Sequence, residues 1–361
     1  PAIDDAGSAV PSSLICLANE TLDDLDRSIW AADDGFARLH PPLEGSCWPY
    51  NEEQPYAELV EMANREPNEE GTGRFVLTPG RRTIGLLDLT TRRQGTSTAP
   101  VHETGGRKRR AGRRMSLCGG TDRVARLASF LEAYLGLPVS VRQGTDEGLA
   151  VRASSGRKKK SKEKKASPSY RIVDSERNLS FPLQTLPSTG DDDEPYRADV
   201  FSIFDVAVEY VRRTEYSLLV LTDLPLGEWV GGDDDDVDEV QEVLGRACGD
   251  RVAVVHCGNA AVDDVELFGT AAHELLHTMG LDHTTSWKCL MNPSCLEVEE
   301  GGQQLFLAPH NLRKLVHFLR EDGNVSFVLE RYRRMMAIWW NVFDERSDDA
   351  KDNYDWVKQK V

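Results

Sequence analysis

Three histidines recur at short spacings between residues 273 and 291. His273 and His277 are four residues apart, so on a helix both imidazoles lie on one face and can reach the same ion. His283 follows six residues later. Neutral imidazoles are zinc ligands, and three protein ligands leave the fourth position of a tetrahedral site open for chemistry. The spacing therefore predicts one catalytic zinc ion on these histidines, although each histidine taken alone would support no such prediction.

Gly280 and Glu274 complete the pattern. A glycine adopts a left-handed backbone at low cost, so Gly280 can end the helix and turn the chain until His283 reaches the same ion. Glu274 projects from an adjacent direction of the helix, near the metal but not bound to it. There it can take a proton from a zinc-bound water and pass it to the leaving amine. These residues predict the hydrolysis of peptide bonds.

The residues around this motif resemble the archaemetzincins, a family of the metzincin clan. Met291 lies eight residues after His283 and matches the methionine turn that packs beneath the metal of metzincins without binding it. Similar segments are "LEAYLGLPVSV" (131–141), "LLVLTDLPL" (218–226), "LGRACGDRVAVV" (244–255) and "LFLAPHNLRKL" (305–315). The resemblance covers most of residues 120–320. It implies a metzincin-like fold and a zinc peptidase with aminopeptidase-like preferences that acts on peptides or proteins.

A second metal site of the family is incomplete in this chain. The resemblance implies a structural zinc held by four cysteines. The matching positions are Thr284, Cys289, Ala308 and Asn311. Because a structural zinc needs four ligands, we expect the second zinc to be absent. A substitute site of Cys289, Cys295 and His310 is one alternative, and two small buried thiols at the cysteines are the other.

The elements that position the motif follow from the apolar pattern. Continuous apolar runs at 217–223 and 251–256 predict strands buried on both faces. A helix at about 264–279 carries the motif. Further helices are predicted at 22–30, 56–64, 121–135, 199–213, 309–321 and 325–343, and further strands at 81–89 and 137–142. The fold class is α/β: a metzincin-like zincin domain with a mixed twisted sheet, an active-site helix and a helical C-terminal subdomain.

Two of the helices carry apolar stripes with predicted roles. The helix at 199–213 is expected to bury one face, made of Phe201, Phe204, Val208 and Val211. The last helix carries Tyr332, Met335, Met336, Trp339 and Trp340, which are expected to form core or a docking surface rather than a cofactor site.

The chain divides into three predicted parts. Residues 1–75 form an approach segment, residues 76–330 the catalytic domain, and residues 331–361 a C-terminal helix and tail. Two polar, low-complexity stretches near 90–116 and 144–195 are predicted to be disordered insertions.

Composition limits the partners. The net charge of −17 argues against nucleic acid, although basic clusters at 107–114 and 157–165 are either solvated loops or a nuclear-localisation or polyanion-binding patch. No apolar run approaches the length of a membrane span. Seven cysteines without a Cys-x-x-Cys pair fit reduced thiols in the cytoplasm or nucleus. The sequence leaves the oligomeric state open.

Two other functions use the same residues. The first is a non-catalytic, metal-binding interaction module on a zincin scaffold, which the acidic loops and the lost cysteines favour. Glu274 argues against it, because metal binding alone needs no general base. The second is a zinc-dependent amidase or deacetylase that acts on other substrates, which the sequence does not distinguish from a peptidase.

Overall fold

The computed structural model describes part of the chain. The described residues are 56–64, 77–90, 121–154, 169–187, 196–230, 239–248, 251–257, 263–284, 289–293, 304–320 and 325–358. The helix predicted at 22–30, both basic clusters and Cys295 lie outside them.

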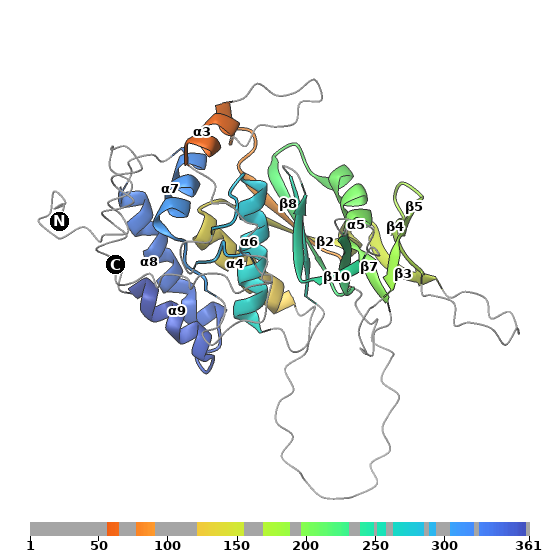
Figure 1. Ribbon diagram of the computed structural model, residues 1–361. Coiled ribbons are helices and arrows are strands. Elements are labelled where there is room, and N and C mark those ends of the chain that lie inside the picture. The colour runs from red at the N-terminus through yellow and green to blue at the C-terminus, as the bar shows by residue number, and fades with distance from the viewer. Residues whose placement is uncertain are drawn as a thin grey trace, which may run out of the picture.

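A five-stranded sheet forms the centre of the molecule (Figure 1). Its order is β11 (Gly245–Cys248), β12 (Val252–His256), β8 (Glu215–Thr222), β1 (Thr83–Asp88) and β2 (Val139–Gln143). Strands β12, β8, β1 and β2 are parallel, and β11 is an antiparallel end strand. Every residue of β8 is buried, as its continuous apolar run predicts. The predicted α/β class with a mixed sheet is confirmed.

Helices cover one face of this sheet (Figure 1). They are α3 (Tyr56–Asn64), α4 (Thr121–Leu135), α6 (Asp264–Thr278), α7 (Pro309–Phe318), α8 (Val325–Val342) and α9 (Asp348–Lys358). One apolar core runs through them, from Leu59 in α3 to Val357 in α9. Among the described residues, none of the helices is long and apolar enough to cross a membrane.

A second apolar core lies on the opposite face of the sheet. It is built by the helix α5 (Val200–Ala207), the 3-10 turn η3 (Val208–Tyr210) and residues of two small sheets; another 3-10 turn, η2 (Gly144–Glu147), lies between β2 and β3 in the chain. One small sheet has the order β3 (Leu149–Ser154), β4 (Ser169–Asp174), β5 (Leu179–Leu183). The other has the order β10 (Glu239–Val243), β9 (Leu226–Val230), β7 (Tyr196–Asp199), β6 (Thr185–Pro187).

The prediction of a disordered insertion at 144–195 is wrong for residues 144–154 and 169–187, which form η2 and β3 to β6. Leu149, Ile172 and Leu183 are buried in the second core together with Leu218 of β8. Burial of these side chains stabilises the strands. The strands are too short to be recognised from the sequence, because low-complexity segments flank them. The remaining residues of this stretch, and residues 91–116, lie outside the described part of the chain.

The buried face predicted for α5 is also wrong in part. Asp199 caps the helix, because its carboxylate accepts hydrogen bonds from the backbone N–H groups of Phe201 and Ser202. Val200, Ile203, Phe204 and Ala207 of this helix are buried in the second core. Phe201 and Val208 are exposed instead, and the α-helix ends at Ala207 rather than near residue 213.

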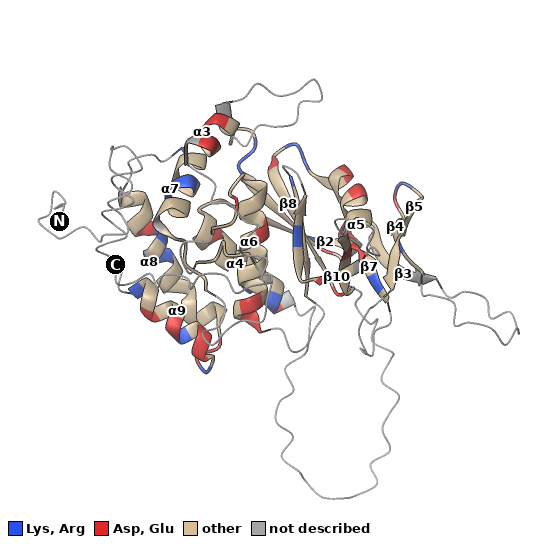
Figure 2. Ribbon diagram, viewed as in Figure 1, with Lys and Arg blue, Asp and Glu red and all other residues tan. Residues whose placement is uncertain are grey.

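Acidic residues begin both α6 and α9, as the red segments in Figure 2 show. The Asp263 side chain caps α6 by accepting a hydrogen bond from the Glu266 backbone N–H. The Asp264 carboxylate pairs with Arg123 and Arg126 of α4. These contacts fix the helix that carries the histidines against its neighbour in the core.

The C-terminal helices belong to the main core. Tyr332, Met335 and Trp339 of α8 are buried, whereas Trp340 is 42 % exposed. Helix α9 was not predicted from the sequence. Its Trp356 ring stacks on the ring of Phe306, with 4.4 Å between the ring centroids. The stripe on α8 is therefore mainly core, as predicted.

Truncating Trp339 to alanine is expected to lower the free energy of unfolding by about 3–5 kcal/mol, the usual cost of a large cavity in a core. The Trp339 ring is 1 % exposed, and its Nε1–H donates to the Ala350 carbonyl at 3.0 Å. Urea unfolding measures the loss. Trp340→Ala is the matched control, and an equal loss in both variants would contradict the assigned packing.

Candidate metal centre

Three imidazole nitrogens converge at the C-terminal end of α6. The Nε2 atoms of His273 and His277 lie 2.9 Å apart, and His283 Nε2 lies 3.2 Å from His277 Nε2 and 3.3 Å from His273 Nε2. In a tetrahedral zinc site with nitrogens at about 2.0–2.1 Å, the ligand nitrogens are about 3.3 Å apart. The three rings are therefore arranged as ligands of one ion.

The opposite ring nitrogens fix the protonation of two of these histidines. His273 Nδ1 lies 2.7 Å from the Leu290 carbonyl oxygen, and His277 Nδ1 lies 2.8 Å from the Leu281 carbonyl oxygen. A carbonyl oxygen only accepts, so each Nδ1 carries the proton and donates it. In the neutral rings both Nε2 atoms then present lone pairs to each other, an arrangement that a cation between them stabilises.

The surroundings keep the rings neutral. Burial and, to a lesser extent, the neighbouring His277 lower the pKa of His273 to about 3. Burial and the neighbour His283 lower the pKa of His277 to about 4. Burial and His273 lower the pKa of His283 to about 3. A histidine must be neutral to bind a metal, so the triad can hold a metal ion at neutral pH.

Gly280 turns the chain as predicted, with a φ of 85°. The Leu281 N–H donates to the Leu276 carbonyl and the Gly280 N–H donates to the His277 carbonyl, the two bonds of a Schellman motif. The motif places the Leu281 carbonyl against His277 and sends the chain back to His283. The helix end and the ligand set are thus one local structure.

Replacing Gly280 by alanine is expected to cost about 1–2 kcal/mol of stability, because an L-residue is strained at positive φ. Zinc affinity is expected to fall as well, since the same turn positions His283. Urea unfolding and zinc titration measure the two effects. Gly80→Ala is the control, because nothing lies near the added methyl group and its φ is not positive. Unchanged zinc affinity in Gly280→Ala would contradict this role of the turn.

Glu274 is buried beside the triad and touches the end strand β11. A Cβ added at Gly245 would lie 2.9 Å from Glu274 Cγ, so only a glycine lets the strand pass this closely. Burial is the main cause that raises the pKa of Glu274 to about 8; the charge of Glu228 also raises this pKa, whereas the charge of Arg246 and a backbone hydrogen bond from Ala247 partly oppose the increase. A cation on the triad would lower it again by attraction. The carboxyl group can therefore exchange a proton near neutral pH.

Met291 lies in a tight turn against the triad. The Asn292 N–H donates to the Cys289 carbonyl to close the turn, and the carbonyl of Leu290 holds His273. Met291 itself is fully buried. The predicted turn is present, and it contributes a backbone acceptor to a ligand histidine.

The resemblance places a second, structural zinc at the positions of Thr284, Cys289, Ala308 and Asn311. In the structure two of these side chains contact each other. Asn311 Nδ2 lies 3.8 Å from Cys289 Sγ and donates to it, and both residues are buried. Within the residues that the structure describes, the triad is the one group of three or more His, Cys, Asp or Glu whose ligand atoms converge. Because Cys295 lies outside them, the absence of a second zinc stays a prediction.

Two charged residues at this site were missed from the sequence. Arg246 of β11 and Glu228 of β9 form an ion pair, with 3.0 Å between Nε and Oε2, and both charges act on Glu274. Their elements are short strands of different sheets, and the residues are 18 positions apart, so no local spacing connects them.

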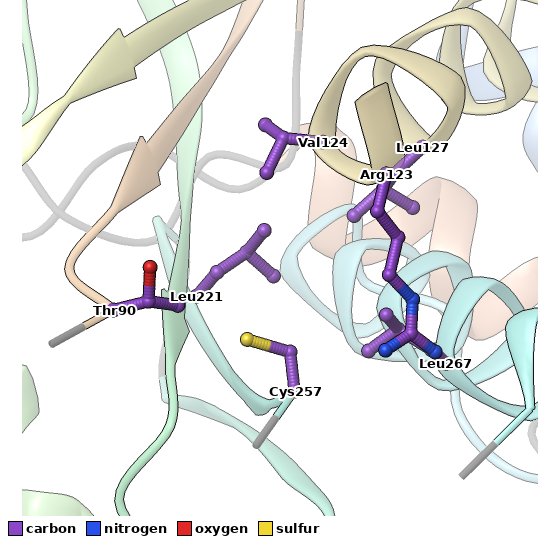
Figure 3. Close-up of a pocket in the computed structure, with 7 residues that line it drawn as sticks. All are labelled: Thr90, Arg123, Val124, Leu127, Leu221, Cys257 and Leu267. Atoms are coloured by element: carbon purple, nitrogen blue, oxygen red, sulfur yellow. The ribbon is translucent and has the colours of Figure 1, made fainter. Parts of the chain in front are cut away.

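A small apolar pocket lies away from the triad, between the sheet and helices α4 and α6. Leu221 and Cys257 from the sheet side face Val124, Leu127 and Leu267 from the helices (Figure 3). The Cys257 thiol donates to the Thr222 carbonyl at 3.3 Å. None of the three histidines lines this pocket, so it is a packing gap of the core.

Comparisons with models of protein families, with curated proteins and with solved structures found no match for this chain.

Proposed function

We propose that this protein is a zinc-dependent metallopeptidase of the metzincin clan, similar to the archaemetzincins. The observation that carries the proposal is the convergence of three neutral imidazole nitrogens beside the buried carboxyl group of Glu274. The Schellman turn at Gly280 and the turn at Met291 support the metzincin assignment. We expect one zinc ion per chain.

In this proposal His273, His277 and His283 hold the zinc ion, which, when bound, acidifies a water molecule and polarises the scissile carbonyl group. Glu274 accepts the proton of the water, because its carboxyl group lies beside the ligands and is ionised once a cation lowers its pKa. It then donates that proton to the leaving amine. The Leu290 and Leu281 carbonyls orient two of the ligand rings throughout.

Strand β11 supports a peptide as the substrate. It ends the order of the central sheet and packs on Glu274. An extended peptide can pair with such an end strand through backbone hydrogen bonds. This pairing would place a peptide bond beside the proposed catalytic groups and would not require a particular amino-acid sequence in the substrate. Aminopeptidase-like action remains part of the proposal.

A reducing compartment, the cytoplasm or nucleus, also fits the described residues. Cys257 and Cys289 are buried in the main core, where the Cys257 thiol donates to the Thr222 carbonyl and Cys289 Sγ accepts from Asn311. Buried cysteines that act as small apolar side chains are compatible with such a compartment.

The experiment that tests the proposal is cleavage of a mixed peptide library by the metal-free and the zinc-loaded protein. Mass spectrometry is expected to show zinc-dependent cleavage, and the positions of the cuts distinguish aminopeptidase from endopeptidase action. His277→Ala is expected to abolish zinc binding and cleavage, and His317→Ala, on α7, to retain both. Stoichiometric zinc without cleavage in any library would contradict the peptidase and favour the interaction module.

A further inference from the structure

Two segments of the chain carry groups that position the candidate metal centre. The first contains His283 and ends, among the described residues, at Thr284. The second is the turn at 289–292, whose Leu290 carbonyl oxygen lies 2.7 Å from His273 Nδ1 and accepts its proton. The arrangement of the histidines therefore depends on how these two segments are held together.

The side chain of Asn292 joins the two segments. Its Oδ1 accepts a hydrogen bond from the Cys289 N–H at 2.9 Å, and its Nδ2 donates to the Thr284 carbonyl oxygen at 2.9 Å. The backbone adds a third bond, from the Thr284 N–H to the Met291 carbonyl oxygen at 2.8 Å. A backbone N–H only donates and a carbonyl oxygen only accepts, so these two partners together require a side chain with one acceptor and one donor.

Both hydrogen bonds of Asn292 act next to groups of the centre. The bond inside the turn closes the chain around Leu290, whose carbonyl oxygen fixes the tautomer and the ring orientation of His273. The other bond holds Thr284, the residue that follows His283. Thr284 is fully buried, where a backbone carbonyl needs a hydrogen-bond partner, and Asn292 supplies one. One amide group thus links the acceptor of one histidine to the backbone beside another.

We infer that Asn292 is a positioning residue of the metal centre, which holds the Leu290 carbonyl and His283 at the separation that lets the three imidazole nitrogens converge. The inference rests on the metal centre of the proposed function and explains what orders that centre. The backbone bond between Thr284 and Met291 remains when the amide is lost. We therefore expect a loosened centre, rather than an absent one, when Asn292 is replaced.

The test compares the full-length wild-type protein with Asn292→Ala. Competition with a chromophoric chelator measures zinc affinity, and urea unfolding of the metal-free proteins measures stability separately. Asn292→Ala is expected to bind zinc about 10–100-fold more weakly, the usual effect of losing a partner that orients metal ligands. The absorption spectrum of the cobalt-loaded protein is expected to change as well, because the d–d bands of Co²⁺ depend on the arrangement of its ligands.

Asp174→Ala is the matched control, because Asp174 also ties a turn to a second segment. Its Oδ1 accepts hydrogen bonds from the backbone N–H groups of Glu176 and Arg177, and its Oδ2 accepts one from the Tyr210 hydroxyl. It belongs to β4, on the opposite side of the central sheet from α6. This variant is expected to unfold at a lower urea concentration and to keep the zinc affinity and the cobalt spectrum of the wild-type protein.

Asn292→Asp decides the question if Asn292→Ala does not fold. Aspartate has nearly the same shape and keeps an oxygen toward the Cys289 N–H, but it cannot donate to the Thr284 carbonyl. Weaker zinc binding is expected here too, although the new negative charge attracts a cation.

The wild-type zinc affinity and cobalt spectrum in a folded Asn292 variant overturn the inference and leave the metal centre intact. An equal loss of zinc affinity in Asp174→Ala also overturns it, because the loss would then follow from general destabilisation. A wild-type protein that binds no zinc overturns the metal centre itself, and the inference with it.

Discussion

Replacing Glu274 by glutamine is expected to lower kcat for peptide hydrolysis by about 10²–10⁴-fold, the usual contribution of a general base. Glutamine keeps the size of the side chain in its buried site but cannot accept the proton of the attacking water. Zinc content is expected to stay at one ion per chain, because the carboxyl group is not a ligand. Initial rates on a library-derived peptide, with metal analysis of the same samples, measure both quantities.

The matched control is Glu330→Gln, which removes an exposed carboxylate on α8 that pairs with Arg334. It is expected to leave the rate unchanged. A Glu274→Gln variant with the full rate would contradict the general base. A variant that loses zinc together with activity would show that Glu274 acts on the metal rather than on the water.

The metal-free protein is expected to lose stability on mild acidification. The folded pKa values of the three histidines are about 3 to 4, below their ordinary value of 6.5. Between these values the unfolded chain binds up to three more protons, so the free energy of unfolding falls as the pH falls from about 6.5 toward 4. Glu274 acts in the opposite direction, because its folded pKa is raised to about 8 and the folded protein holds its proton.

The net loss between pH 7 and pH 5 is on the order of 3 kcal/mol, since two of the three protons remain uncompensated. Urea unfolding of the metal-free protein at both pH values measures it. Glu274→Gln removes the opposing effect and is expected to increase the loss, whereas replacing all three histidines by glutamine is expected to reverse its sign. If the free energy of unfolding changed equally with pH in the wild-type protein, Glu274→Gln and the triple glutamine variant, the burial of neutral imidazoles in the centre would be contradicted.

The convergence of the three histidines could be predicted because their spacing coincides with local structure. The interval between His273 and His277 matches one helical turn, and Gly280 adopts the positive φ that its place after the helix suggested. Strand β8 was predictable for a related reason, because a fully buried strand needs a continuous apolar run. In each case one short segment determines its own conformation.

Features that depend on distant partners could not be predicted in this way. On α5 the periodicity identified the buried Phe204 but also selected Phe201 and Val208, which are exposed, because the helix ends at Ala207 and packs on distant segments of the second core. Strands β3 to β5 are stabilised by the second core, which joins segments far apart in the chain. The pair of Arg246 and Glu228 forms only because two sheets meet beside Glu274.

X-ray absorption spectroscopy of the zinc-loaded protein tests the central claim most directly. The account predicts one zinc per chain, bound by three imidazole nitrogens and one oxygen at about 2.0–2.1 Å. Sulfur scattering at about 2.3 Å, or two zinc ions per chain, would show that Cys289 or Cys295 holds metal. A protein that binds no zinc with the three histidines intact would contradict the account.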